Sequence, residues 1–461
     1  MKTNIRGLLS LLVLCTCTPA FGQKQAPPEG SQPKDFTLPP KIEFTLGNGL
    51  KATLVQFGTI PKVTVRVVVR AGNINDGENE VWLSDLTGDL MKEGTSTRSS
   101  QEIAKQVARM GGGISITVGD DQTQIAGEVL SEFGGDFVKL LADVTRNPKF
   151  PESELSRLKN DRVRQLSIDK ADPNSMTTEL FRKLLYPNHP YGRVYPTEKM
   201  LRDYAIEQVK NFYRKNFGAH RTHIYVAGKF DAKGMEAAVR EAFTNWSAGP
   251  EFVENLPTPV SQREIHIIDR PGAPQSTIFL GLPVIDPSQK DYRPLGLMNQ
   301  LLGGSFASRI TTNIRENKGY TYSPGSFISS RYRSAYWVQV ADVSTAVTGP
   351  SLKEIFYEID RLQKEAPSVE ELKGIQNYAA GVFVLQNSSA NGIINQLSFL
   401  DLHGLAESYL ADAVKNIYAV TPEQIQQLCA THLKADRMTI VIAGDRKKIE
   451  KQVAPYGKVV K

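Results

Sequence analysis

Ile-Tyr-Val-Ala-Gly at residues 224–228 returns in near copy as Ile-Val-Ile-Ala-Gly at residues 440–444, close to the end of the chain. The last glycines of these two runs, Gly228 and Gly444, are 216 residues apart, and the same separation joins Pro151 to Pro367. Two landmarks with one offset are hard to explain by chance. The sequence therefore predicts two halves that are built on one plan.

The order of the expected elements is the same in both halves. In the first half, a β-type run at 63–69 precedes a helical pattern over 83–91, and Ser99 with Glu102 forms a capping box for a helix over 101–110. Alternating residues and a long amphipathic helix follow. Strands that alternate with long helices in this way favour helices packed on a mostly antiparallel sheet.

The second half repeats the pattern with a strand at 277–280, a helix over 295–302, a short helix over 309–316 and a strand at 320–322. Pro367 then opens a helix for which Ser368 and Glu371 are the predicted capping box. We predict an α+β fold with two homologous halves, each a mostly antiparallel sheet covered by helices, arranged as a clamshell.

The first 22 residues are typical of a secretory signal peptide. Lys2 and Arg6 are positive, an apolar run covers 8–13, and the small-x-small pattern at 20–22 predicts cleavage after Gly22. The apolar run is too short to span a bilayer. We therefore expect a periplasmic or secreted protein.

Two low-complexity segments predict the domain boundaries. Residues 23–43 are rich in Pro, Gly, Gln and Lys and are interpreted as a flexible arm, and residues 248–262 as a linker. The first α+β domain then covers 44–247 and the second covers 263–461.

Composition excludes several functions for the mature chain. Loss of Lys2 and Arg6 lowers the formal net charge from +6 to +4, and no Lys/Arg cluster predicts a nucleic-acid interface. No later segment is long and apolar enough for a transmembrane helix. Cys429 is the one cysteine beyond the signal peptide; no internal disulfide is possible, and we expect a small buried side chain there.

Six short motifs carry a resemblance to a known family. They are Leu-Gly-Asn-Gly-Leu (46–50), Glu-Gly-Thr (93–95), His-Pro-Tyr-Gly (189–192), Gly-Gly-Ser-Phe-Ala-Ser-Arg (303–309), Arg-Glu-Asn-Lys-Gly-Tyr-Thr-Tyr (315–322) and Ala-Gly-Asp (443–445). In this order and spacing the chain resembles the pitrilysin/insulinase family of zinc peptidases, which includes the mitochondrial processing peptidase subunits. The resemblance covers nearly the whole mature chain.

Active members of that family bind zinc through His-x-x-Glu-His on a helix of the first half, with the glutamate as base and a distant glutamate as further ligand. Counting back from 94–95, Asp85 and Asp89 occupy the histidine positions and Gly88 the base position. The helix that should supply the distant glutamate reads Arg-Val-Arg-Gln-Leu at 162–166. We therefore expect no metal bound by this chain.

Asp85 and Asp89 share one helix face and could suit a hard cation, but no third carboxylate is evident nearby. We favour the interpretation that both face solvent or cap local backbone groups.

The second half keeps the other functional pair that the resemblance implies. In active relatives, an arginine and a tyrosine seven residues later hold the substrate backbone and the developing oxyanion above the zinc, and Arg315 and Tyr322 match them. The alternative is an ordinary surface arginine and a strand tyrosine. Arg309 and Lys318 are expected to add positive potential in the same place.

Three functions remain open from the sequence. The favoured one is a non-catalytic subunit that pairs with a zinc-bearing sister subunit and contributes Arg315 and Tyr322 to peptide hydrolysis in trans. The second is a stand-alone peptide-binding or scaffold protein. The third is a zinc metallopeptidase with an atypical site. A peptide or unfolded protein is the expected substrate or ligand in each case.

Overall fold

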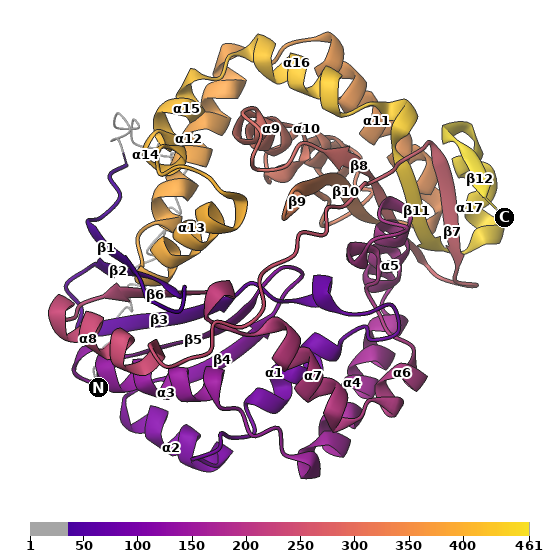
Figure 1. Ribbon diagram of the computed structural model, residues 1–461. Helices are drawn as coiled ribbons and strands as arrows, with labels where there is room; N and C mark the ends of the chain where they lie inside the picture. Colours follow the sequence, from indigo (N-terminus) through magenta and orange to yellow (C-terminus); the bar gives the residue numbers. More distant parts are fainter. Residues whose placement is uncertain (1–35, 461) are drawn as a thin grey trace, which may run out of the picture. The chain divides into compact units, whose positions relative to one another are not determined.

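Two six-stranded sheets form the framework of the computed structural model, which describes residues 36–460 (Figure 1). Each sheet is formed by one half of the chain and has its own buried apolar core. The predicted signal peptide and most of the predicted arm lie outside the described residues.

The first sheet has the strand order β1-β2-β6-β3-β5-β4, in which only the β2–β6 pair is parallel. Its strands are β1 (Lys41–Thr45), β2 (Lys51–Gln56), β3 (Lys62–Val69), β4 (Gly113–Val118), β5 (Thr123–Leu130) and β6 (Thr222–Gly228). On β3, Val63, Val65 and Val67 face the helices of the same half, because side chains alternate between the two faces of a strand.

The second sheet has the order β12-β7-β11-β8-β10-β9. Its run β7-β11-β8-β10-β9 corresponds to the run β2-β6-β3-β5-β4 of the first sheet. Its strands are β7 (Glu264–Asp269), β8 (Gln275–Val284), β9 (Gly325–Arg331), β10 (Ser334–Ser344), β11 (Thr439–Gly444) and β12 (Lys458–Val460). The repeated runs at 224–228 and 440–444 form equivalent strands, β6 and β11, and both lie next to a parallel neighbour. The predicted class of two similar α+β halves is confirmed.

Most helices of each half lie on one face of that half's own sheet, with one exception in each half. Those of the first half are α1 (Leu83–Met91), α2 (Ser100–Arg109), α3 (Gly134–Arg146), α4 (Glu152–Ala171), α5 (Pro173–Leu185), α6 (Glu198–Asp203), α7 (Ile206–Asn216) and α8 (Ala232–Phe243). Those of the second half are α9 (Tyr292–Asn299), α10 (Arg309–Thr311), α11 (Thr348–Lys364), α12 (Val369–Gln386), α13 (Ala390–His403), α14 (Ser408–Ala411), α15 (Ala413–Ala419), α16 (Pro422–His432) and α17 (Arg446–Val453).

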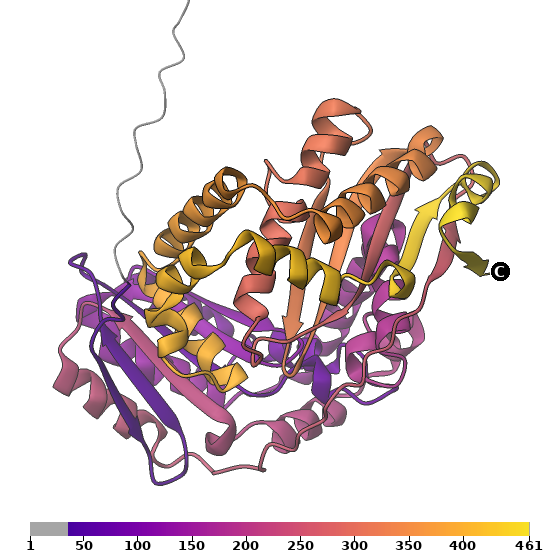
Figure 2. The ribbon, with the colours of Figure 1, turned by 90° about the horizontal axis from the view of Figure 1, so that it is seen from above.

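The halves also exchange one helix each. Helix α5 of the first half packs on β8 and β11 of the second sheet, where Phe181 meets Phe279 and Tyr336 (Figures 1 and 2). Helix α13 of the second half packs on β3 and β6 of the first sheet through Ile393 and Ile394. Each sheet is therefore covered on its second face by a helix from the other half.

Some local predictions are confirmed. Ser99 caps α2, since its hydroxyl accepts a hydrogen bond from the Glu102 amide while the Glu102 carboxylate accepts one from the Ser99 amide at 2.8 Å. Cys429 is fully buried.

Of the other local predictions, the Ser368–Glu371 capping box forms only in part, and the strand at 320–322 is wrong. Ser368 accepts a hydrogen bond from the Glu371 amide, but the Glu371 carboxylate binds Arg309 instead of returning to Ser368. Residues 320–322 form one isolated bridge, Thr321 to Val343, rather than a strand.

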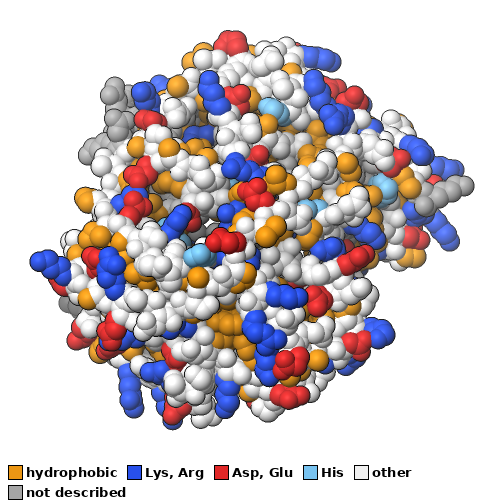
Figure 3. All heavy atoms as spheres, viewed as in Figure 1, with side chains coloured by type: hydrophobic (Ala, Val, Ile, Leu, Met, Phe, Trp, Pro, Cys, Tyr) orange, Lys and Arg blue, Asp and Glu red, His pale blue; other side chains and the backbone are white. Residues whose placement is uncertain are grey.

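The face of the molecule seen in Figure 3 carries Lys, Arg, Asp and Glu side chains in a mixed distribution, with apolar side chains scattered among them. No helix within residues 36–460 combines the length and the apolar character that a bilayer span requires.

Candidate functional site

Helix α1 carries the residues at the positions of the expected zinc motif. The N-cap residue of this helix is Trp82, which has a left-handed backbone conformation (φ 69°) and whose side chain caps no backbone amide. The carboxylate of Asp76 replaces that cap, because it accepts hydrogen bonds from the amides of Trp82 (3.0 Å) and Ser84 (2.9 Å). This cap fixes the first turn of α1, where Asp85 lies one turn before Asp89.

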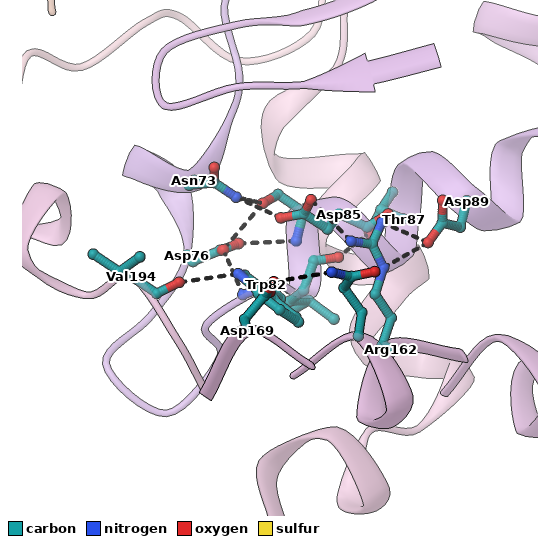
Figure 4. A network of polar contacts seen from close by, with 12 residues as sticks. Asn73, Asp76, Trp82, Asp85, Thr87, Asp89, Arg162, Asp169 and Val194 are labelled. Atoms are coloured by element: carbon teal, nitrogen blue, oxygen red, sulfur yellow. Dashed lines mark hydrogen bonds and ion pairs between the residues drawn. The ribbon is translucent and has the colours of Figure 1, made fainter. Parts of the chain in front are cut away.

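Arg162 of α4 binds both aspartates (Figure 4). Its Nε donates to Asp89 Oδ2 at 2.7 Å, its Nη2 lies 2.6 Å from the same oxygen, and its Nη1 donates to Asp85 Oδ1 at 3.2 Å. The three side chains are only 19–22% exposed. A guanidinium thus lies between the two carboxylates that replace the histidines.

Asn73 holds the second oxygen of Asp85 through a 2.7 Å hydrogen bond from its Nδ2. Burial raises the pKa of Asp85, while the Arg162 guanidinium and the Asn73 amide act in the opposite direction. The aspartate oxygens are therefore already engaged by donors of the chain itself.

A side chain at the base position would have to displace a neighbouring side chain. A Cβ atom added to Gly88 would lie 2.8 Å from Val118 Cγ2 and 3.6 Å from Ile116 Cγ2, both on β4. Contacts shorter than 3.0 Å require a neighbour to move. Glycine at residue 88 is thus tied to the close approach of α1 and β4.

These residues do not fit a zinc ion. Tetrahedral zinc sites use imidazole, thiolate or carboxylate ligands at about 2.0–2.3 Å, and a cationic guanidinium occupies the space that faces both aspartates. Across residues 36–460 no group of three His, Cys, Asp or Glu side chains is placed to hold a metal. The interpretation of Asp85 and Asp89 as solvent-facing or capping residues is wrong, because both are partly buried and bind Arg162.

The second candidate pair comes together on the second half. Arg315 Nε donates to the Tyr322 carbonyl at 2.9 Å, and its guanidinium lies 4.4 Å from the centre of the Phe306 ring. Tyr322 is 88% exposed and Phe306 is 72% exposed. No hydrogen bond or ion pair among the described residues joins this group to the Asp85–Arg162 cluster.

The two neighbouring cations are less available than expected. Arg309 makes two 2.7 Å hydrogen bonds to the Glu371 carboxylate, and Lys318 lies 3.6 Å from Glu354. The expected extra positive potential is therefore largely neutralised. The role of Arg162 was not predicted from the sequence, where residues 162–166 were considered only because they lack an acidic residue. The signal that could have identified it is a basic residue on one helix and two acidic residues, Asp85 and Asp89, on another.

Comparisons with known proteins identify the family of the two halves. The family model described as "Insulinase (Peptidase family M16)" matches residues 54–194, and the model described as "Peptidase M16 inactive domain" matches residues 204–378. The chain is 24% identical over 392 residues to an uncharacterized zinc protease, YmxG, of Bacillus subtilis, with 84% of this chain and 94% of that protein covered. An uncharacterized zinc protease of Rickettsia felis is 23% identical over 400 residues, with coverage of 85% and 91%.

Two solved structures have the same fold. The peptidase M16 inactive domain from Pseudomonas fluorescens gives a TM-score of 0.80 at 25% identity and covers 88% of this chain and 98% of that chain. A protease from Helicobacter pylori gives a TM-score of 0.81 at 17% identity, with coverage of 88% and 100%. The duplicated fold and the two matching family models define a peptidase-like protein. More specifically, the chain belongs to the pitrilysin/insulinase family, peptidase family M16.

Proposed function

We propose that this chain is a non-catalytic member of its family that pairs with a zinc-bearing sister subunit and contributes substrate binding and oxyanion stabilisation to peptide hydrolysis. The observation that carries the proposal is the Arg162 guanidinium between Asp85 and Asp89. A chain without ligands or a base cannot activate water by itself, so zinc is expected in the partner.

The exposed Tyr322 and Phe306, together with the partly buried Arg315, support a contribution in trans. The Arg315 guanidinium also pairs with the Glu316 carboxylate. A guanidinium and a phenol hydroxyl are suitable donors for a carbonyl oxygen that becomes negative during hydrolysis. The Arg315 contact with the Tyr322 carbonyl ties the loop that carries Tyr322 to the helical segment Thr312–Asn317 that carries Arg315. Because the Tyr322 ring makes almost no contact with its own chain, it is free to reach a substrate held by another subunit.

The proposal is tested by co-expressing the mature chain with a zinc-bearing family member from the same cell envelope and measuring cleavage of a quenched fluorescent peptide. We expect a stable hetero-oligomer that cleaves the peptide, and no cleavage by this chain alone. Arg315→Gln combined with Tyr322→Phe should lower kcat/KM by about 100-fold, the loss typical of an oxyanion donor.

Arg437→Gln, at an exposed arginine of the same half, is the matched control and should leave kcat/KM unchanged. Chelator-sensitive cleavage by the purified chain alone would contradict the proposal. A monomer or homodimer that binds peptide but joins no zinc-bearing subunit would favour the scaffold function.

We also propose that the pair assembles outside the cytoplasm, because residues 1–22 have the pattern of a secretory signal. Amino-terminal sequencing of the envelope-localised protein should then begin at Gln23. A cytosolic protein that keeps its initial residues would contradict this localisation.

A further inference from the structure

A cavity of about 600 Å³ lies in the second half, away from both sites described above. Its wall is contributed by α9, α12, α13 and α14, and includes Arg293, Phe383, Asn391, Asn395, Phe399 and Tyr409. The volume is within the range of about 300–1,000 Å³ of ligand-binding pockets. The wall combines aromatic rings with amide groups and one guanidinium, and none of its residues is acidic.

Arg293 is a cation without a counter-charge in this cavity. Its Nη2 donates to the Tyr409 carbonyl at 2.7 Å, and its guanidinium lies 4.2 Å from the centre of the Tyr409 ring. Within residues 36–460 no carboxylate forms an ion pair with it. Burial lowers its pKa, since desolvation disfavours the charged form.

A second unpaired arginine lies behind the same wall. Arg66 of β3 is 6% exposed and donates to the Oδ1 atoms of Asn391 and Asn395, two residues that line the cavity. Its Nε has no hydrogen-bond partner in the described part of the chain, and no acid pairs with it there. Burial of an unpaired guanidinium costs free energy. Arg66 itself lines a neighbouring pocket with Glu128, so the lining of the cavity owes its own positive charge to Arg293.

The N-terminal end of α13 adds to this positive charge. The helix begins at Ala390 after the cap Ser389, and both Ser389 and Asn391 line the cavity. The start of a helix carries a partial positive charge. Arg293 and the start of α13 therefore give the cavity positive potential, and Arg66 acts on it only through Asn391 and Asn395. An anion in the cavity would be stabilised by both lining groups.

We infer that this cavity binds a peptide carboxylate, with an adjacent apolar side chain placed on the rings of Phe383, Phe399 and Tyr409. Arg293 receives the carboxylate, and the amide groups of Asn391 and Asn395 complete the polar wall in front of Arg66. The inference rests on the proposed function, because that function makes a peptide the ligand. The carboxylate can come from the C-terminus of a peptide or from an acidic side chain.

The test uses the purified mature chain alone and three fluorescein-labelled nonapeptides that share a Phe residue. One ends in Phe with a free carboxylate, one is C-terminally amidated with Glu beside Phe, and one is amidated with Gln in that place. Fluorescence anisotropy should give about tenfold tighter binding for an acidic peptide than for the neutral one, as for a charge-assisted hydrogen bond. The preferred acidic peptide identifies the source of the carboxylate.

Variants locate the binding site. Arg293→Gln should weaken the acidic peptide about tenfold and leave the neutral peptide unchanged, while Arg293→Lys should recover part of the loss. Asn391→Asp places a carboxylate beside Arg66, so it should keep the fold stable and yet repel the acidic peptide. Arg437→Gln should have no effect.

Equal affinity for all three peptides, or acidic-peptide binding that survives both Arg293→Gln and Asn391→Asp, would overturn the inference. These outcomes are separate from the test of the proposed function, since no sister subunit is present. If the pair cleaves peptides while this binding assay shows no preference, only the cavity assignment is wrong.

Discussion

At the scale of single residues, the first-half helix carries an ion-paired cluster at the positions of the zinc motif. Arg162 donates to Asp85 and Asp89, which lie at the histidine positions of the zinc motif. A divalent ion and a guanidinium can each place a positive charge between two helices. Of the two, only the metal ion can activate water. The consequence is a partly buried charge cluster that links α1 to α4.

Removing Arg162 should therefore destabilise the chain. Arg162→Leu leaves two partly buried aspartates unpaired, and we expect the free energy of unfolding in urea to fall by about 2–4 kcal/mol. The control is Arg164→Gln on the same helix, whose side chain is 70% exposed; its cost should be below about 0.5 kcal/mol. If Arg162→Leu costs no more than the control, the ion pair has no structural role.

The base position gives a second prediction. Gly88→Glu should lower the free energy of unfolding by about 1–3 kcal/mol, because its Cβ would be forced against Val118. Val118→Ala in the same chain should recover part of that loss. An unchanged stability of Gly88→Glu would show that α1 and β4 are less tightly packed than the geometry indicates.

At the scale of elements, α13 crosses to the first sheet and ends on a buried histidine. His403 is 2% exposed, and its Nδ1 has no hydrogen-bond partner among residues 36–460. Burial lowers the pKa of His403 to about 4; Asp286 opposes this shift, and Arg333 and Arg70 reinforce it. The helix is therefore docked with a neutral imidazole at its C-terminal end.

This histidine predicts an acid-sensitive fold. Between its unfolded pKa of about 6.5 and the folded value of about 4, only the unfolded state binds the proton. The neutral His403 imidazole contributes its full share to the free energy of unfolding above pH 6.5. This contribution is lost as the pH falls towards 4, by up to about 1.4 kcal/mol per pH unit. Urea unfolding across this range should show a smaller pH slope for His403→Gln than for the natural chain; equal slopes would rule this residue out as a cause.

At the scale of the whole described chain, exchanged helices and buried ion pairs join the two halves. Asp120, in the turn between β4 and β5, binds Arg182 of α5 and Arg331 of β9, each at 2.8 Å. The two arginines hold the pKa of Asp120 low against the effect of burial. Neither half can separate without exposing charged and aromatic groups that are now buried.

The halves should therefore unfold together. Phe181→Ala removes the aromatic contact of α5 with the second sheet and should cost about 3–5 kcal/mol. Calorimetry should show one transition at a lower temperature, while Tyr357→Ala, at a half-exposed ring, should leave it in place. Two resolved transitions, of which Phe181→Ala moves only one, would mean that the halves fold independently.

Several features of the fold could be predicted from local sequence patterns. The duplication follows from the equal offset of Gly228 from Gly444 and of Pro151 from Pro367, and the Ser99–Glu102 capping box and the burial of Cys429 follow from a few neighbouring residues. The loss of the zinc motif is likewise a matter of residue types along one helix. In each case the physical cause acts over one or two helical turns or along a single strand.

The tertiary structure decided the rest. Arg162 meets Asp85 and Asp89 across more than 70 residues of chain, and Val118 fills the space beside Gly88 from another element. The crossing of α5 to the second sheet and α13 to the first has no local signal either, because an amphipathic helix shows that it has a partner but not which sheet provides it. Local sequence determined the helices and strands and the residue types on α1, whereas long-range packing determined which side chains meet there, since contact energies depend on proximity in space.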